Sequence, residues 1–320
     1  MSIQTTHGMA FGQVALSVAD FRRTLDFYCD LLGFARAGWT DQFEGEVIAQ
    51  GLGLPAPTAN IDVGWIVDRQ DFFNIEVIQF LDPPMRPRAD DSRASDIGYS
   101  LVFVHLADFD GTIRRLTDAG VEAPVRGKAG DRRATITDPD GVLLELWERD
   151  VRVEGAPEQP RPEINAAVRG VRASVPDLTR SRSFFVDVLG LRESDVVLHG
   201  PEDEASWDLP GAKCELVTVT GGDYFVELVQ YADPVPAPRR AGHSLLDQGI
   251  LNIALGSRER APFEATRAAV AATDGTRLQL ELPISEVAAV NYVDDPDGFS
   301  VELIYMEESV DKDFGLVPIE

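Results

Sequence analysis

The chain has 320 residues, of which 44% are apolar and 26% charged, and this is an ordinary composition for one large or two medium globular domains. Its formal net charge of −25 argues against nucleic acid and anionic membrane surfaces as partners, because a strongly acidic chain is repelled by phosphate groups. Two cysteines, Cys29 and Cys214, are too few for a disulfide framework, and the first residues lack the features of an export signal. We therefore expect a cytoplasmic protein.

The first 80 residues predict a strand, a helix and three further strands. Residues 12–18 alternate in polarity as a half-buried strand does, and they lead to Asp20 at the start of a helix. Gly33 stands where the C-cap of this helix belongs. Strand-like runs follow at residues 46–50, 61–67 and 73–80. The helix itself is predicted from apolar residues at helical spacing, namely Phe21, Leu25, Tyr28 and Leu32.

The same order of elements recurs along the rest of the chain. A strand at residues 99–108, a helix at 110–120 and a strand at 142–148 form the second unit. The last quarter opens with a strand at residues 250–257 and continues with a helix at 265–275. Two "DPDG" stretches, at residues 138–141 and 295–298, predict type I turns that set the register of the final hairpin in each half.

The two halves of the chain are copies of each other. "FFNIEVIQFLDPPMRPRA" (Phe72–Ala89) resembles "YFVELVQYADPVPAPRRA" (Tyr224–Ala241), and the segments that begin at residues 12 and 170 also match. Three separate matches give offsets of 157, 151 and 157 residues, which indicates an internal duplication. The polar, proline-rich residues 151–166 are predicted to link the halves.

Four βαβββ units with the phrases "VALSVADFRRTLDFYCDLLGF" and "DPDGVLLELWE" resemble the vicinal oxygen chelate superfamily, which includes glyoxalases, bleomycin-resistance proteins and extradiol dioxygenases. The resemblance implies an α+β fold in which paired units form open half-barrel cups, usually with a substrate on a divalent metal. It places a first domain at residues 10–150 and a second at residues 167–308, with a C-terminal tail at residues 309–320.

The resemblance also implies which residues face the centre of a cup. In the family, metal ligands come from the first and fourth strands of each unit. The matching positions are Gln13, Glu76, Leu101 and Glu145 in the first half, and Gly170, Glu227, Asn252 and Glu302 in the second. None of these is a histidine. The expected cofactor is therefore either none or a weakly held divalent metal (Mn, Mg, Fe or Zn) on Gln13, Glu76 and Glu145.

A carboxylate in a cup without a metal needs another partner, because an unpaired buried charge is costly. Arg172 lies two residues after Gly170 and so shares its strand face. We expect its guanidinium either to pair with Glu227 or Glu302 in place of a cation, or to be exposed at the strand edge.

The candidate catalytic residues are Glu76 and Glu145, as bases whose pKa burial raises, and His105. His105 lies on the predicted cup face of its strand, where it is either a general base at the mouth or a structural histidine. The inward positions are mostly apolar or aromatic, which suits a hydrophobic or aromatic ligand. The predicted ligand contacts are Phe103, Trp147, Arg172, Tyr231 and Asn252.

Two functions remain open at this level. One is an enzyme that performs lyase, isomerase or ring-opening chemistry on an oxygenated hydrophobic molecule, and the other is a metal-free protein that sequesters such a molecule. A further possibility is that one half works while the other stabilises it. The expected partners are a small molecule and, as the default for such domains, a second copy of the chain in a homodimer.

Overall fold

The computed structural model describes residues 3–319 and contains four βαβββ units in chain order. The first unit has β1 (Ala10–Ser17), α1 (Phe21–Asp26), the π-helical segment η1 (Phe27–Leu32), β2 (Ala35–Gly45), α2 (Glu46–Gly51), β3 (Ala59–Val67) and β4 (Asn74–Asp82). The second has β5 (Gly98–Leu106), α3 (Phe109–Asp118), β6 (Val125–Lys128), β7 (Asp131–Thr137) and β8 (Leu143–Trp147).

The third and fourth units repeat this order. The third has β9 (Ala166–Ser174), α4 (Leu178–Ser183), η2 (Phe184–Val188), β10 (Arg192–Ser194), α5 (Pro201–Ser206), β11 (Lys213–Thr220) and β12 (Phe225–Asp233). The fourth has β13 (Gly249–Ser257), α6 (Arg260–Ala271), β14 (Arg277–Leu278), β15 (Leu282–Ser285), β16 (Ala288–Asp294) and β17 (Ser300–Met306), followed by the short helix η3 (Glu308–Val310). None of the helices among the described residues is long and apolar enough to cross a membrane.

Local sequence signals explain the first helix. The carboxylate of Asp20 accepts hydrogen bonds from the backbone N–H groups of Arg22 and Arg23 at 3.0 and 3.1 Å, as an N-cap residue does. Gly33 ends the helical segment with a φ of 84°, which favours glycine. These two predictions are confirmed. The strand predicted at residues 46–50 is wrong: this segment is the helix α2, and the strand lies just before it, in β2.

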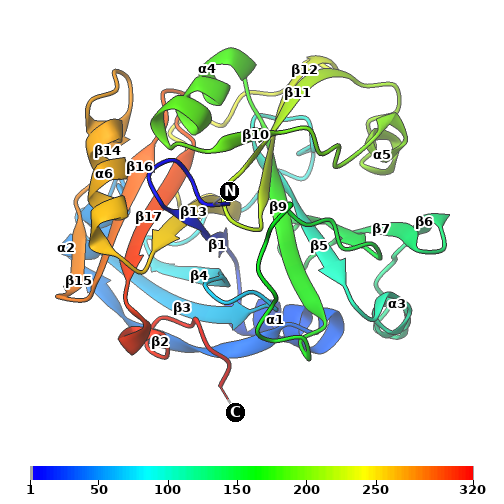
Figure 1. Ribbon diagram of the computed structural model, residues 1–320, viewed down its shortest axis with the longest axis horizontal. Coiled ribbons are helices and arrows are strands. Elements are labelled where there is room, and N and C mark those ends of the chain that lie inside the picture. Colours follow the sequence, from blue (N-terminus) through cyan, green and yellow to red (C-terminus); the bar gives the residue numbers. More distant parts are fainter. Residues whose placement is uncertain (1–2, 320) are drawn as a thin grey trace.

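Each of the two sheets takes one βαβββ unit from each half of the chain. The first and fourth units form a nine-stranded sheet in which β1 pairs with β13, and the second and third units form an eight-stranded sheet in which β5 pairs with β9. Figure 1 shows the nine-stranded sheet on the left and the eight-stranded sheet on the right. Residues 151–166 separate the two copies along the sequence, but each sheet contains strands from both copies.

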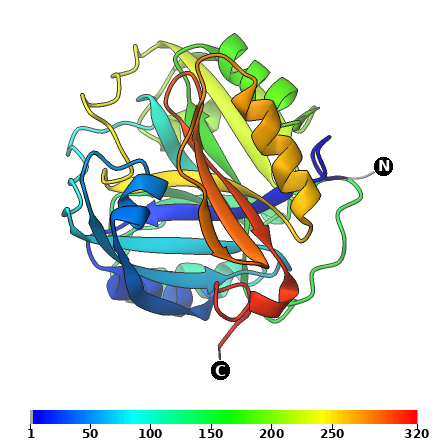
Figure 2. The same ribbon diagram turned by 90° about the vertical axis from the view of Figure 1, so that its left-hand side faces the viewer.

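The α+β fold with two half-barrel sheets is the fold class predicted from the sequence. The largest cluster of buried apolar side chains lies on the sheet faces that the helices cover, and it includes Phe21, Phe109, Phe185 and Phe263. Figure 2 shows α6 lying across the strands of the nine-stranded sheet. Two smaller clusters occupy the opposite faces, one in each cup. The cups therefore lie on the sheet faces that the helical layer leaves free.

Candidate functional site

The cup of the nine-stranded sheet encloses a cavity of about 300 Å³, and we call it the open cup. Its walls are mostly apolar and come from α2, β3, β15 and β17 and from the segment after η3. Val47, Ile48, Val63, Ile304 and Phe314 are among the lining residues. The polar lining groups lie on β1, β4, β16 and β17. The open cup thus has the form of a small-molecule site: an apolar cavity with a few convergent polar groups.

Two carboxylates converge on one amide at the floor of this cavity. The side chain of Gln13 donates from Nε2 to Oε2 of Glu76 at 3.0 Å and to Oε2 of Glu302 at 2.8 Å. Trp65 donates from Nε1 to the other oxygen of Glu76 at 3.3 Å, and Tyr292 makes a hydrogen bond with Glu302. Both acids line the cavity, but Glu302 is only 3% exposed, whereas Glu76 is half-buried. Glu76 is therefore the acid that a ligand reaches more readily.

Small residues between the polar ones make this convergence possible. Gln13 lies opposite Ala254 across the β1–β13 pair, and Ala15 lies opposite Asn252. Glu76 and Glu302 are the neighbours of these alanines on the outer strands β4 and β17. Within the fourfold repeat of the βαβββ unit, Gln13 of the first unit is equivalent to Asn252 of the fourth and Glu76 to Glu302, so two matched polar pairs share one face. Asn252 is fully buried, and neither polar atom of its side chain has a hydrogen-bond partner.

The environment of the two carboxyl groups favours their protonated forms. Burial raises the pKa of Glu76 to about 7, with the hydrogen bonds from Trp65 and Gln13 acting in the opposite direction. Burial and the nearby charge of Glu76 raise the pKa of Glu302 well above its usual range. Like charges this close cannot both be ionised cheaply, so the pair retains one proton at neutral pH.

This pair predicts a pH dependence of stability. A carboxyl group whose pKa is higher in the folded state binds its proton more tightly there, so its contribution to stability is full below the ordinary pKa of 4.5 and is lost as the pH rises through about 7. We expect Glu76→Gln, which mimics the protonated form, to gain on the order of 2 kcal/mol over the parent between pH 5 and pH 8, since one pKa unit corresponds to about 1.4 kcal/mol. Urea unfolding in the presence of a chelator measures this gain, and an equal difference at both pH values would contradict it.

The equivalent cup of the eight-stranded sheet is occupied by its own side chains, and we call it the filled cup. The positions equivalent to Ala15 and Ala254 hold Arg172 and Phe103, which are both fully buried. Phe103 stacks on Trp147 with ring centroids 4.9 Å apart. At Gly170, which is equivalent to Gln13, an added Cβ would lie 2.3 Å from the carbonyl oxygen of Phe225. This position therefore has no room for a side chain that could ligate a metal.

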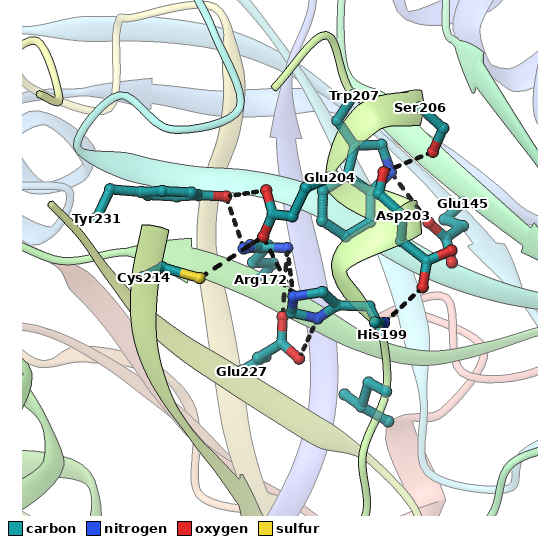
Figure 3. A network of polar contacts seen from close by, with 12 residues as sticks. Glu145, Arg172, His199, Asp203, Glu204, Ser206, Trp207, Cys214, Glu227 and Tyr231 are labelled. Atoms are coloured by element: carbon teal, nitrogen blue, oxygen red, sulfur yellow. Dashed lines mark hydrogen bonds and ion pairs between the residues drawn. The ribbon is translucent and has the colours of Figure 1, made fainter. Parts of the chain in front are cut away.

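Arg172 is the centre of a buried ionic network in the filled cup (Figure 3). Its Nη2 donates to Glu204 and to the hydroxyl of Tyr231, both at 2.6 Å, and its Nη1 lies 3.5 Å from Glu227. The imidazole of His199 lies 2.7 Å from Glu227 and 3.2 Å from Glu204. Burial alone lowers the pKa of His199, but hydrogen bonds with Cys214, Glu204 and Glu227 outweigh it and raise the pKa to about 11. Two cations thus neutralise two carboxylates.

A second buried cluster surrounds Glu145. Its carboxylate accepts hydrogen bonds from Arg126 at 2.8 Å and Arg133 at 2.9 Å. The indole N–H groups of Trp147 and Trp207 donate to it at 2.8 and 2.9 Å. Four donors, two of them cationic, therefore hold Glu145, and it is fully buried. These four donors occupy the lone pairs of the carboxylate, so none is left to face a cavity.

Comparisons with known proteins agree with this geometry. Residues 10–146 match the sequence model of the Glyoxalase/Bleomycin resistance protein/Dioxygenase superfamily. The matched segment spans the first two βαβββ units and therefore covers less than half of the chain. Glyoxalase I from Zea mays is similar over 93% of this chain and 92% of its own, with a TM-score of 0.56 and 18% sequence identity. A putative dioxygenase from Bacillus subtilis is similar over 99% of this chain and 98% of its own, with a TM-score of 0.61 and 13% identity.

At these identities the structural similarity shows the fold alone. A search of curated protein sequences finds no match. Within the superfamily fold, the pairing of the first unit with the fourth decides which residues meet. It brings Gln13 and Glu76 together with Glu302, which the grouping by sequence halves had placed in another domain.

The grouping of Gln13, Glu76 and Glu145 in one metal site is therefore wrong, because β1 and β4 lie in one sheet and β8 lies in the other. Arg172 does pair with Glu227, as one of the two expectations for it states, but Glu302 lies in the other sheet. His105 lies beside Asp150 at 3.9 Å, and burial lowers its pKa. It lies in the sheet of the filled cup, away from the cavity of the open cup.

The predicted ligand contacts divide between the cups in the same way. Asn252 belongs to the open cup. Phe103, Trp147, Arg172 and Tyr231 pack inside the filled cup, where the polar tips of Trp147 and Tyr231 bond to Glu145 and Glu204. Sequence reasoning missed Trp65, Tyr292, His199 and Glu204. Trp65 and Tyr292 lie directly opposite Glu76 and Glu302 on the neighbouring strand of the same unit, so the register of these strand pairs would have revealed them. No periodic signal marks the others.

Proposed function

We propose that the open cup binds an uncharged, apolar molecule of one or two rings that carries oxygen atoms, and that the Glu76–Glu302 pair acts on it as an acid–base catalyst. The observation that carries this proposal is the convergence of both carboxylates on Gln13 at the floor of an apolar cavity. Carboxyl groups with raised pKa values in a cavity are typical of catalytic sites.

The size and the charge of the cavity support this class of ligand. An apolar cavity of about 150 Å³ can hold one benzene ring, so the open cup, at about 300 Å³, has room for roughly two rings. No lysine or arginine is among its lining residues in the described part of the chain. Exposed Glu44 and Glu46 adjoin the lining residues Phe43 and Val47. A carboxylated or phosphorylated carrier group would find no cation in this cavity.

The proton shared by the two carboxyl groups defines the chemistry. Glu76 faces the cavity with a pKa of about 7, so near neutral pH it can accept a proton from a bound molecule or donate one to it. Glu302 is the more deeply buried of the two and stays protonated when Glu76 is ionised. The hydrogen bonds from Gln13 and Trp65 fix the direction in which the carboxylate of Glu76 points. This chemistry fits a lyase or isomerase step next to an oxygen-bearing carbon.

The same residues fit a divalent metal. Gln13 and Asn252 would each offer an amide oxygen, and Glu76 and Glu302 would offer carboxylates. Such an all-oxygen set suits Mg²⁺ or Mn²⁺ better than metals that prefer nitrogen or sulfur. The buried and unpartnered side-chain amide of Asn252 is the structural observation that favours this fit. When bound, the metal would polarise a substrate oxygen.

A second function is supported by a separate observation. Nε2 of Gln13 already bridges the two carboxylates, so these two groups have a hydrogen-bond donor without a cation. This favours a metal-free protein that sequesters an apolar molecule, as the bleomycin-resistance type of the superfamily was expected to do. The two functions differ in whether the bound molecule is recovered unchanged.

Two fluorescent probes that differ in one charge test the ligand class. 1-Naphthylamine is neutral near pH 7, and 5-aminonaphthalene-1-sulfonate carries a sulfonate on the same two-ring system. We expect the neutral probe to bind at least about tenfold more tightly, the ratio that corresponds to 1.4 kcal/mol. Fluorescence titration of the purified protein measures both affinities. Equal affinities would contradict the proposed ligand class, and failure of both probes to bind would contradict the proposed site.

Glu76→Gln/Glu302→Gln is the matched variant for this titration. We expect it to bind the sulfonate more tightly than the parent does, because the variant removes the negative charge that the Glu76–Glu302 pair carries near neutral pH. Metal analysis of the same samples, purified without chelator, separates the two functions. A metal lost in this variant and retained in Glu227→Gln, a change in the filled cup, supports the metal-assisted enzyme.

A further inference from the structure

A second cavity lies between the two sheets, away from both cup floors. Its volume is about 550 Å³, and we call it the inter-sheet groove. It is formed by the segments 87–97 and 237–248 and by the first residues of β5 and β13, which belong to different sheets. The two segments contact each other, since the N–H of Ile97 donates to the carbonyl of Ala237 at 3.0 Å. They descend from the same repeated phrase of the sequence.

The duplication places two equivalent arginines in this groove. Arg88 donates from Nη1 to the carbonyl of Gly141 at 3.1 Å, and Arg239 donates from Nη1 to the carbonyl of Gly298. These glycines end the two "DPDG" turns, so the same contact occurs twice, once in each half. Both guanidinium groups therefore have fixed positions in the wall of the groove.

Neither arginine has a carboxylate partner. Among the described residues, no carboxylate oxygen lies within 4.0 Å of either guanidinium group. The other arginines of the groove differ: Arg93 pairs with Asp96 at 2.8 Å, and Arg240 pairs with Asp247 at 3.2 Å. Burial lowers the pKa of both Arg88 and Arg239, and it outweighs the opposing charges of nearby aspartates, among them Asp138 for Arg88 and Asp295 for Arg239.

Other polar atoms of the groove also lack partners. Ser100 is only 3% exposed, lines the groove, and its hydroxyl oxygen has no hydrogen-bond partner. Nε of Arg239 is buried and likewise unpaired. Gly98 and Gly249 begin the two strands, and an added Cβ on Gly98 would meet no atom within 4 Å. A buried polar group without a hydrogen-bond partner costs free energy, so a ligand that bonds to such groups gains affinity.

We infer that the inter-sheet groove is a second ligand site, which takes a small molecule with carboxylate or phosphate groups held by Arg88, Arg239 and the hydroxyl of Ser100. Arginine suits this role because its planar group donates two parallel hydrogen bonds to a carboxylate or phosphate. The site is of opposite character to the open cup, whose lining has carboxylates and no cation among the described residues. It does not depend on the function proposed for that cup.

Titration calorimetry with inorganic phosphate, pyrophosphate and succinate tests this site. We expect at least one of these anions to bind the parent protein, and Arg88→Gln and Arg239→Gln each to weaken binding by about tenfold or more, as the loss of a charge-assisted hydrogen bond does. The phosphates and succinate distinguish the two kinds of anion. Absence of heat from all three at millimolar concentrations would overturn the inference.

Arg149→Gln is the matched control. Arg149 is 54% exposed, pairs with Asp131 and lies outside the groove, so its loss changes the net charge equally. We expect it to leave anion binding unchanged, and an equal loss in this variant would show general charge attraction and overturn the inference. Ser100→Ala keeps both arginines and their packing. We expect Ser100→Ala to weaken anion binding and to keep the unfolding midpoint of the parent. This variant therefore tests the site even if Arg239→Gln fails to fold.

Discussion

Arg172→Met is expected to lower the free energy of unfolding by about 3–5 kcal/mol at neutral pH, the cost typical of breaking a buried ion pair by removing one partner. The substitution leaves Glu204 and Glu227 in place, with His199 as their remaining cationic contact among the described residues. It also removes the hydrogen bond from Arg172 to Tyr231. Urea unfolding, compared through the transition midpoint and slope, measures the loss.

Two further variants test the cause of this loss. Arg172→Met/Glu204→Gln removes one of the abandoned charges, so we expect it to recover part of the stability. Arg149→Gln, in which an exposed ion pair is lost, should change stability by less than about 1 kcal/mol. A loss below 1 kcal/mol for Arg172→Met itself would mean that the network does not hold the filled cup together.

Much of the fold follows from local signals in the sequence. Asp20 and Gly33 delimit the first helix, the alternation in residues 12–18 predicts β1, and the offsets of the repeated phrases define the units. The pairing of units does not follow from such signals. The first strands of all four units alternate in the same way, so the pattern alone cannot choose whether β1 pairs with β5 or with β13.

The error at residues 46–50 has a similar origin. "EVIAQ" contains β-branched residues and reads as a strand, but its side chains Val47 and Ile48 line the open cup from a helix. The equivalent helix α5 of the third unit, "PEDEAS", is acidic and sends Asp203 and Glu204 into the filled cup. Tertiary contacts with the cup thus override the local preference of a short segment.

The two cups show how one framework gives two outcomes. Ala15 and Ala254 keep the middle of the open cup free, so carboxylates on the outer strands reach Gln13. At the equivalent positions Arg172 and Phe103 occupy that space, and the carboxylates of the filled cup bind arginine and histidine instead. We conclude that the residues beside the metal-ligating positions of the family decide, as much as those positions themselves, which cup has room for a small molecule.

Ala254→Phe tests this conclusion, because it gives the open cup the residue that its counterpart has at Phe103. The new ring would project from β13 toward Ile304, which lines the cavity at the position equivalent to Trp147. We expect the affinity for 1-naphthylamine to fall by about tenfold or more, since the ring and the probe compete for one apolar volume. Fluorescence titration gives the affinity, and circular dichroism verifies the fold.

The control for this change is Ala268→Phe, which adds the same ring at an exposed position of α6. It should bind the probe as the parent does. Overpacking a dense core typically costs about 1–3 kcal/mol, whereas a ring that enters an existing cavity costs less, so Ala254→Phe should remain near the stability of the parent. Unchanged probe affinity in a folded Ala254→Phe protein would show that the probe binds elsewhere. It would contradict the proposal that the open cup is the ligand site.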